Sequence, residues 1–259
     1  MRPIDLEVTE VIEEGDGIAT LRFDREFDVS AGNYGMFWVR GVDEVPMSFS
    51  YPDGITVRAI GETTQAMTEM EVGDSLGVRG PFGESFDLPD SDSGEVVVVG
   101  GGTGMAPVAL LTEEAAREGL DVTTLIGAAT ADEVVFEQRL SSLDGVDVRV
   151  ATDDGTKGHE GYVTELLDGY DADDVDMVAS CGPEPMMAKV LERYDEEDVE
   201  VRFSLERYMK CGIGICGSCC IDDTGSRVCA DGPVYDGDSL RGGEFGVYHR
   251  DAAGRKEEF

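Results

Sequence analysis

The sequence is poor in positive charge. It contains 20 lysines and arginines, only four of them lysines, against 56 aspartates and glutamates, so that its net charge is −36. No basic stripe is present that could replace the counterions of a nucleic acid, and anionic membranes should repel the chain for the same reason. We therefore expect neither nucleic acid nor a membrane among its partners.

Long apolar runs and export signals are also missing. No segment approaches the roughly 18 consecutive apolar residues of a membrane-spanning helix. The first residues, MRPIDLEVTEV, lack the basic and then apolar pattern of a signal peptide. These features predict a cytoplasmic protein. The acidic residues are spread over the whole length, which suits a solvated surface in a salt-rich cytoplasm, because molar ionic strength screens charges beyond about 3 Å.

Five of the six cysteines lie in one glycine-rich segment, Met209–Val234. Four residues separate Cys211 from Cys216, two separate Cys216 from Cys219, and nine more precede Cys229. This is the ligand order of a plant-type [2Fe–2S] site, in which four thiolates converge on two irons. We predict these four cysteines as cluster ligands. The glycines at 212, 214 and 217 leave little bulk between them and let backbone N–H groups face the sulfurs.

Three other interpretations of the cysteines were weighed. A zinc site usually has two C-x2-C pairs or mixes cysteine with histidine, and the only histidines here are His159 and His249. A disulfide framework suits a small secreted domain better than a chain of 259 residues. Five cysteines within nineteen residues are too concentrated to be only small apolar side chains. The remaining Cys220 is predicted to be structural.

The N-terminal third predicts a small antiparallel β-barrel. Between Ile4 and about Leu88 the chain has six short alternating runs interrupted by glycine: LEVTEVI, IATLRF, YGMFWVR, MSFSY, ITVRAI and SLGVRG. Strand-length runs at this spacing are typical of such barrels.

After Glu95 the pattern changes to that of an α/β domain. The apolar run Val96–Val99 predicts a buried parallel strand, which enters the turn GGGTGMAP at 100–107 and a helix over 108–117. A strand, a glycine turn and a helix N-terminus form a site for pyrophosphate. The dinucleotide fingerprint is incomplete, because Pro107 stands where glycine or alanine is expected. An ordinary α/β turn therefore stays an alternative.

The alternation continues to residue 204. Strands are predicted over 122–127, 146–151, 175–180 and 199–204, and helices over 131–143, 163–167 and 184–194. This is a doubly wound α/β domain, whose ligands bind at the carboxyl ends of the strands. The loops 152–155 and 180–184 lie at those ends, although both could be simple turns. The polar tail from Arg241 to Phe259 is expected to be mobile.

The order of the three parts resembles the ferredoxin-reductase superfamily, and most closely the electron-transfer subunit of type B dihydroorotate dehydrogenases. The resemblance covers residues 4–240. Its most specific segments are TDDG at 152–155 with GYVT at 161–164, CGPEPM at 181–186, MKCGIG at 209–214 and CADGPV at 229–234. It implies an FAD-binding barrel over 1–90, an NAD-binding α/β domain over 91–203 and a cluster-binding domain with the tail over 204–259.

The resemblance also implies the residues of two further cofactor sites. The FAD site would comprise Pro46, Met47, Ser48, Val57, Arg58, Thr63 and Thr64, with Ser48 near the isoalloxazine N5. The NAD(H) site would comprise Gly101, Gly102, Thr103, Gly104, Ala106, Pro107, Cys181, Gly182, Pro183 and Glu184. One position departs from the family pattern: Val45 replaces the arginine that normally binds flavin phosphate. We expect either that Arg58 or Arg40 substitutes for it, or that a salt-adapted protein binds FAD with fewer cations.

The implied function is a relay of electrons between NAD(H), FAD, the [2Fe–2S] cluster and an FMN-containing dihydroorotate dehydrogenase catalytic subunit, in a heterotetramer that converts dihydroorotate to orotate. We expect NADH rather than NADPH, because Asp153 and Asp154 offer no cation for a 2′-phosphate. A related reductase that serves a hydrogenase, a ferredoxin or an oxygenase is an alternative. A non-catalytic iron–sulfur or zinc protein that senses redox state is an alternative of another class.

Overall fold

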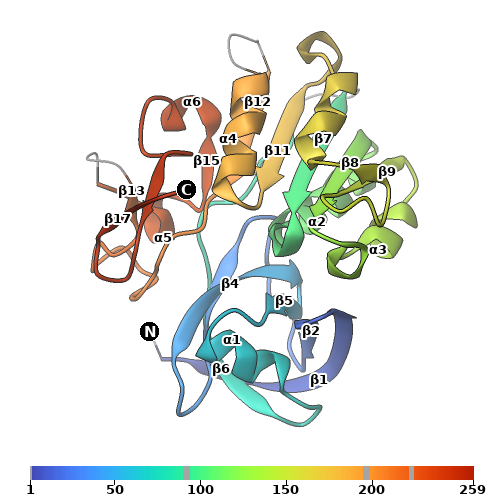
Figure 1. Ribbon diagram of the computed structural model, residues 1–259. Coiled ribbons are helices and arrows are strands. Elements are labelled where there is room, and N and C mark those ends of the chain that lie inside the picture. Colours follow the sequence, from blue (N-terminus) through green and yellow to red (C-terminus); the bar gives the residue numbers. More distant parts are fainter. Residues whose placement is uncertain (1, 90–93, 195–198, 222–224) are drawn as a thin grey trace.

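The computed structural model describes residues 2–89, 94–194, 199–221 and 225–259. Figure 1 shows three parts: a β-barrel formed by the N-terminal residues, a sheet with helices packed along it, and a C-terminal part beside both. Among the residues described, no helix is long and apolar enough to cross a membrane.

The N-terminal part is a closed antiparallel barrel with the strand order β1-β2-β5-β4-β3-β6. Its strands are β1 (Ile4–Gly15), β2 (Ile18–Phe23), β3 (Tyr34–Trp38), β4 (Glu44–Tyr51), β5 (Gly54–Arg58) and β6 (Ser75–Phe82), and helix α1 (Glu62–Thr68) joins the last two. The alternating apolar residues point inward, among them Leu6, Val8, Phe37 and Phe49. The six predicted strands are therefore confirmed.

The second part is a seven-stranded sheet with the order β10-β9-β8-β7-β11-β12-β15. Its strands are β7 (Glu95–Gly101), β8 (Asp121–Ala128), β9 (Val146–Thr152), β10 (His159–Glu160), β11 (Met177–Cys181), β12 (Glu200–Ser204) and β15 (Val234–Asp236). All neighbours pair in parallel except β12 and β15. The doubly wound arrangement is confirmed, and the segment after the cysteines returns to this sheet as its antiparallel edge strand.

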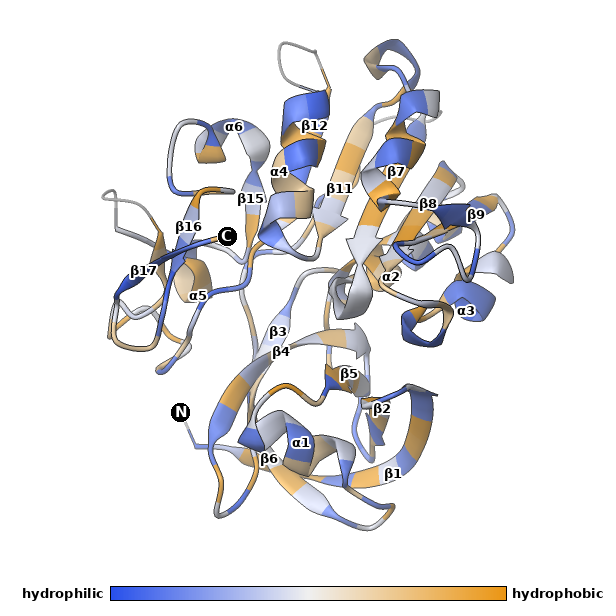
Figure 2. Ribbon diagram, viewed as in Figure 1, coloured by the Kyte–Doolittle hydropathy of each residue, from blue (hydrophilic) through white to orange (hydrophobic). Residues whose placement is uncertain are grey.

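Alternate residues of the central strand β7 serve two different cores. Val96 and Val98 belong to a cluster that includes α2 (Met105–Glu118) and the barrel interior. Val97 and Val99 belong to a second cluster, which includes α4 (Glu184–Arg193) and the cysteine-bearing part. The apolar bands on β7 and β11 are visible in Figure 2. A strand that is buried on both faces must be apolar throughout, as this one is.

The predicted helix over 131–143 is wrong in its middle. A short 3₁₀ turn, η2 (Ala131–Glu133), is followed by α3 (Glu137–Ser141), and between them Phe136 adopts a left-handed conformation with φ 66°. Phe136 is buried and meets the ring of Tyr51 edge-on, with 6.3 Å between the ring centroids. Packing against the barrel thus overrides local helix propensity.

The other predicted helices are found at nearly the expected residues, but one of them is a 3₁₀ helix rather than an α-helix. The segment expected as a helix over 163–167 is the 3₁₀ helix η3 (Val163–Gly169). The remaining short turns are η1 (Gly102–Gly104) and η4 (Ala172–Asp174). The C-terminal part contains β13 (Cys220–Ile221), β14 (Ser226–Arg227), α5 (Val228–Asp231) and α6 (Gly237–Leu240).

The tail is not the mobile segment that its polarity suggested. Strands β16 (Tyr248–Arg250) and β17 (Lys256–Glu258) form an antiparallel pair. Phe245 is buried against Phe203, with 5.2 Å between the ring centroids. Phe245 helps to attach this segment to the sheet, because burying an aromatic side chain removes a large apolar area from water.

A buried cluster of charges joins the tail, α4 and the segment that leads into the cysteines. Side-chain exposure is 3% for Arg207, 6% for Glu184 and 1% for Glu244. Arg207 binds both carboxylate oxygens of Glu184, and its Nε lies 3.5 Å from Glu244. The backbone N–H of Gly246 donates to Glu184 at 2.9 Å. The guanidinium of Arg207 therefore lies between two buried carboxylates, and Arg250 adds a second cation beside Glu244 at 3.4 Å.

We expect Arg207→Met to lower the free energy of unfolding by about 3–5 kcal/mol, because it leaves the buried carboxylate of Glu184 without its counter-charge. Chemical denaturation in high salt measures this effect. Arg255→Met is the matched control, since Arg255 pairs with Asp251 at the surface with 76% exposure and should hardly change stability. Equal stability of the two variants would contradict the role of the buried cluster.

The excess of carboxylates makes a second prediction about stability. Even if every one of the 20 cations forms an ion pair, 36 acidic groups of the 56 repel one another. We expect the melting temperature to fall when KCl is reduced from about 2 M to about 0.05 M, because screening of exposed charges is lost. A thermal unfolding series over salt concentration tests this, and a constant melting temperature would contradict it.

Candidate functional site

The segment that carries the predicted cluster ligands, here called the cysteine loop, comprises residues 209–219 together with Cys229. It lies against two strands of the barrel. The hydroxyl of Tyr34, on β3, is 3.1 Å from the carbonyl oxygen of Gly212 and 2.9 Å from that of Cys229. Arg79, on β6, donates to the carbonyl oxygen of Cys211 at 3.1 Å. Gly212 has φ +67°, and a Cβ there would lie 2.6 Å from Cγ of Met36. Only glycine allows the loop to approach the barrel this closely.

The four predicted ligands come together as two pairs. The thiol of Cys216 lies near enough to that of Cys211 to affect its pKa, and the thiol of Cys219 likewise affects the pKa of Cys229. Two irons that each take two thiolates require this arrangement. All six cysteines of the chain are free of disulfides. Within the described ranges, no three histidine, cysteine or acidic side chains gather tightly enough to hold a single metal ion.

Backbone N–H groups face the sulfurs of this loop. Ile215 and Cys216 donate to Sγ of Cys211 at 3.3 and 3.5 Å. Gly214 donates to Sγ of Cys229 at 3.1 Å, and the N–H of Cys229 donates to Sγ of Cys219 at 3.4 Å. Such donors stabilise negatively charged sulfur, whether as thiolate or as part of a cluster.

The thiol pKa values reflect this environment. Burial opposes ionisation of Cys211, but N–H groups of Ile213, Cys216 and Ile215 outweigh it and lower the pKa to about 6. Burial and the neighbouring Cys219 instead raise the pKa of Cys229 to about 12. The donor set, the pairing and the N–H groups fit a [2Fe–2S] cluster. Cys220 points away, with its Sγ 3.6 Å from the carbonyl oxygen of Gly225.

The two loops predicted to bind the nucleotide lie against each other at the carboxyl edge of the sheet. A Cβ on Gly104 would lie 2.6 Å from the carbonyl oxygen of Cys181, and one on Gly101 would lie 2.7 Å from Pro183. Gly102 and Thr103 are partly exposed at this turn, whereas Ala106 and Pro107 are buried in the first turn of α2. The contact between β7 and β11 therefore brings distant glycines into one surface.

Not every side chain of these loops is available to a ligand. The carboxylate of Glu184 is held by Arg207. Burial raises the pKa of the Cys181 thiol to about 12, so this group stays protonated. The loop TDDG at 152–155 follows β9 at the same edge, where Asp153 and Asp154 are exposed. The arrangement can present backbone groups, two acidic side chains and a neutral thiol to a nucleotide.

The predicted flavin residues lie on the barrel, with different accessibility. Pro46, Met47 and Ser48 are partly exposed on β4, whereas Phe49 and Ser50, which follow them, are buried. This is the strand that contacts α2 across the boundary between barrel and sheet. Ser48 is the strand partner of Tyr34. A partly exposed segment of a barrel strand beside the nucleotide turn fits a flavin that must meet a nicotinamide.

The other predicted flavin residues are engaged within the protein. The side chain of Val57 is 1% exposed inside the barrel, so only its backbone can contact a ligand. Thr63 is buried, and Thr64 Oγ1 accepts the N–H of Gly61 at 2.9 Å as the cap of α1.

The two arginines expected to replace the missing motif arginine are both engaged in ion pairs. Arg58 makes a bidentate pair with Glu133 at 2.9 and 3.0 Å, and Arg40 pairs with Asp5 and donates to Ser75. Val45 itself is partly exposed on β4. A bound flavin phosphate would have to compete with Glu133 for Arg58. The site therefore lacks the arginine of the family motif at position 45, and the arginines expected to replace it are already paired.

The residues that support the cysteine loop could not be found from motifs. Tyr34 and Arg79 are about 130 to 195 positions away from their partners in the loop, and Arg227 holds the carbonyl of Gly214 at 2.8 Å. Sequence spacing carries no information on the contacts of Tyr34 and Arg79, because they form only when the folded barrel lies against the loop.

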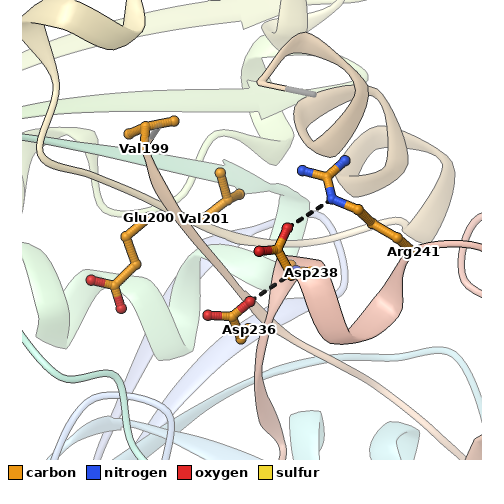
Figure 3. Close-up of a pocket in the computed structure, with 7 residues that line it drawn as sticks. Val199, Glu200, Val201, Asp236, Asp238 and Arg241 are labelled. Atoms are coloured by element: carbon orange, nitrogen blue, oxygen red, sulfur yellow. Dashed lines mark hydrogen bonds and ion pairs between the residues drawn. The ribbon is translucent and has the colours of Figure 1, made fainter. Parts of the chain in front are cut away.

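A separate hollow of about 270 Å³ lies between β12 and α6, away from these sites. Val199, Glu200, Val201, Asp236, Gly237, Asp238 and Arg241 line it (Figure 3). Arg241 donates to Asp238 at 2.8 Å, and Asp236 caps α6 through the N–H of Asp238. These groups stabilise a helix, and no predicted cofactor residue is among them.

Two family models match the chain. The iron–sulfur cluster binding domain of dihydroorotate dehydrogenase B matches residues 206–241, and the oxidoreductase NAD-binding domain matches residues 98–192. Their limits enclose the cysteine loop and the glycine turn.

Solved structures share the fold. The NADH-dependent reduced ferredoxin-NADP oxidoreductase superposes with a TM-score of 0.80 at 23% identity, over 90% of this chain and 88% of that one. The ferredoxin reductase of carbazole 1,9a-dioxygenase gives a TM-score of 0.67 at 19% identity, over 78% and 68%. The ferredoxin-reductase-like architecture is thereby confirmed.

Full-length relatives are found in methanogens. Proteins named as probable dihydroorotate dehydrogenase B (NAD(+)), electron transfer subunit, from Methanocella arvoryzae and Methanocaldococcus jannaschii are 47% and 43% identical, over 100% and 98% of both chains. This identity extends over the barrel, the sheet and the cysteine loop alike. The chain belongs to the family of dihydroorotate dehydrogenase B electron transfer subunits.

Proposed function

We propose that this chain carries electrons between NAD(H) and an FMN-containing dihydroorotate dehydrogenase catalytic subunit, through FAD and a [2Fe–2S] cluster. The main support for this proposal is the position of the cysteines. They lie against strand β3, whose neighbour in the barrel, β4, carries the predicted flavin motif. When bound, the groups supply hydride transfer at the nicotinamide, conversion between two- and one-electron transfer at FAD, and one-electron transfer at the cluster. Oxidation of dihydroorotate to orotate belongs to the partner.

The chain's own residues would bind and orient these groups. Residues 101–104, at the start of α2, would bring backbone N–H groups to the pyrophosphate, and residues 181–183 would limit the nicotinamide position. Asp153 and Asp154 would favour NADH, because they would repel a 2′-phosphate. Pro46 to Ser48 would lie along the flavin ring, and Cys211, Cys216, Cys219 and Cys229 would bind the cluster. The corresponding domains are 1–90, 91–203 and 204–259.

The surface around the cysteine loop would dock the partner. Ile215 is 78% exposed and Ile213 is 42% exposed, and Cys216 lies beside them at the surface. Exposed apolar residues next to a redox group fit a protein interface, since an electron must leave over a short distance. We propose a heterotetramer with the catalytic subunit in the cytoplasm, whose reducing conditions suit six free cysteines.

The ratio of released flavins tests the assignment of the partner. We expect the tagged chain, expressed in a salt-rich host and purified anaerobically, to yield FMN and FAD in a ratio near one, because the FMN enzyme travels with it. FAD without FMN would point to another acceptor, such as a ferredoxin. The absence of both flavins would contradict the proposed flavin site.

A second prediction separates the steps of the relay. Cys216→Ser should remove the cluster absorbance and abolish electron delivery to the partner, because one iron loses a thiolate, whereas anaerobic bleaching of the flavin by NADH should continue. Cys220→Ser is the matched control and should keep both activities, since the Cys220 thiol faces Gly225. If Cys216→Ser loses flavin reduction while its fold is intact, the linear order is wrong.

A further inference from the structure

The carbonyl groups of the cysteine loop are bound from outside the loop. Gly212 presents its carbonyl oxygen to the hydroxyl of Tyr34, and Gly214 presents its own to Nη1 of Arg227 at 2.8 Å. These donors come from the barrel and from β14, neither of which is part of the loop. The two carbonyls therefore point away from the sulfurs.

Peptide geometry converts these contacts into an orientation of the N–H groups. In a trans peptide unit, C=O and N–H point in opposite directions. The peptide that gives its oxygen to Tyr34 carries the N–H of Ile213, and the peptide that gives its oxygen to Arg227 carries the N–H of Ile215. The N–H of Ile215 donates to Sγ of Cys211 at 3.3 Å. The N–H of Ile213 lies close enough to the same thiol to lower its pKa. Each outside donor thus orients one N–H group toward this sulfur.

Both outside donors are held firmly. Tyr34 is 2% exposed and packs against Phe82, with 5.9 Å between the ring centroids. Its hydroxyl has one proton, which it shares between Gly212 and Cys229. Arg227 is held by Asp231 through Nε and Nη2, each at 3.0 Å, which leaves Nη1 for Gly214. The planar guanidinium fork binds the carboxylate in a bidentate way and keeps Nη1 directed at the carbonyl, a fixed geometry that an ammonium group does not provide.

We propose that Tyr34 and Arg227 are positioning residues that aim two backbone N–H groups at the Cys211 sulfur and thereby raise the reduction potential of the cluster. Hydrogen bonds to the sulfurs stabilise the reduced cluster more than the oxidised one, because reduction adds negative charge. The inference rests on the proposed function only in assuming that a cluster binds at these cysteines.

The test is the midpoint potential of the cluster in the full chain, measured by dithionite titration with EPR detection. Tyr34→Phe removes the hydroxyl and keeps the ring. Arg227→Lys keeps the positive charge and removes the fork, so that loss of charge cannot explain a shift. For each variant we expect the equilibrium constant for reduction of the cluster to fall about tenfold. For a one-electron couple this lowers the midpoint potential by about 59 mV. Each should also lose one exchangeable proton coupled to the reduced cluster in ENDOR spectra.

Tyr235→Phe is the matched control. Its hydroxyl is also partly buried and near the same cysteines, but it is 2.9 Å from Ser226 Oγ rather than from a loop carbonyl. We expect its potential to equal that of the wild type. An unchanged potential in Tyr34→Phe and Arg227→Lys, with the cluster present, would overturn the inference. If Tyr34→Phe loses its cluster, the potential of Arg227→Lys decides. A wild-type chain without any cluster signal would instead refute the proposed function.

Discussion

The hydrogen bonds that Tyr34 makes to the cysteine loop join the barrel to the C-terminal part of this protein. The loop has no regular secondary structure between residues 205 and 219, so its shape depends on groups outside it. Tyr34 comes from the barrel, its strand partner Ser48 belongs to the flavin motif, and its acceptors include a predicted cluster ligand. A buried hydroxyl that must find partners is a strong constraint on the position of the loop.

A second constraint acts where the loop leaves the sheet. Arg207 stands four residues before Cys211 and holds Glu184, which begins α4 directly after the nucleotide loop 181–183. The tail closes this site through Glu244. The nucleotide loop, the cysteine loop and the tail therefore share one buried charge cluster, and a displacement of one segment would expose or unpair the charges of the others.

Several of the few cationic side chains in this protein are arginines that hold its parts together. Arg79 binds Glu44 and a loop carbonyl, Arg58 joins the barrel to Glu133 next to the sheet, and Arg227 binds Asp231 and a loop carbonyl. Each of these contacts uses the fork of the guanidinium, which a lysine does not have. Because the chain has 56 acidic residues and only 20 basic ones, most charged groups at its surface are carboxylates.

Local patterns in the sequence were sufficient for most of the elements, and they supplied the predicted ligand set. Alternation predicted the six barrel strands, apolar runs predicted the parallel strands, and the spacing of Cys211, Cys216, Cys219 and Cys229 predicted a cluster loop, because periodicity and ligand spacing are properties of neighbouring residues. The prediction was wrong where a distant contact decided the outcome. Phe136 breaks a predicted helix to reach Tyr51, and Phe245 attaches a polar tail to the sheet.

The environment of the predicted sites was decided by the tertiary structure alone. Glu184 and Arg58 stand at motif positions, yet both side chains are engaged by partners 23 and 75 positions away. Tyr34 and Arg227 carry no motif, yet they orient the peptides that face Cys211. Short-range patterns record what a residue can do, and closure of the barrel against the sheet determines which groups it meets. Residue type and spacing therefore determined the chemistry of this chain, and long-range packing determined how that chemistry is held in place.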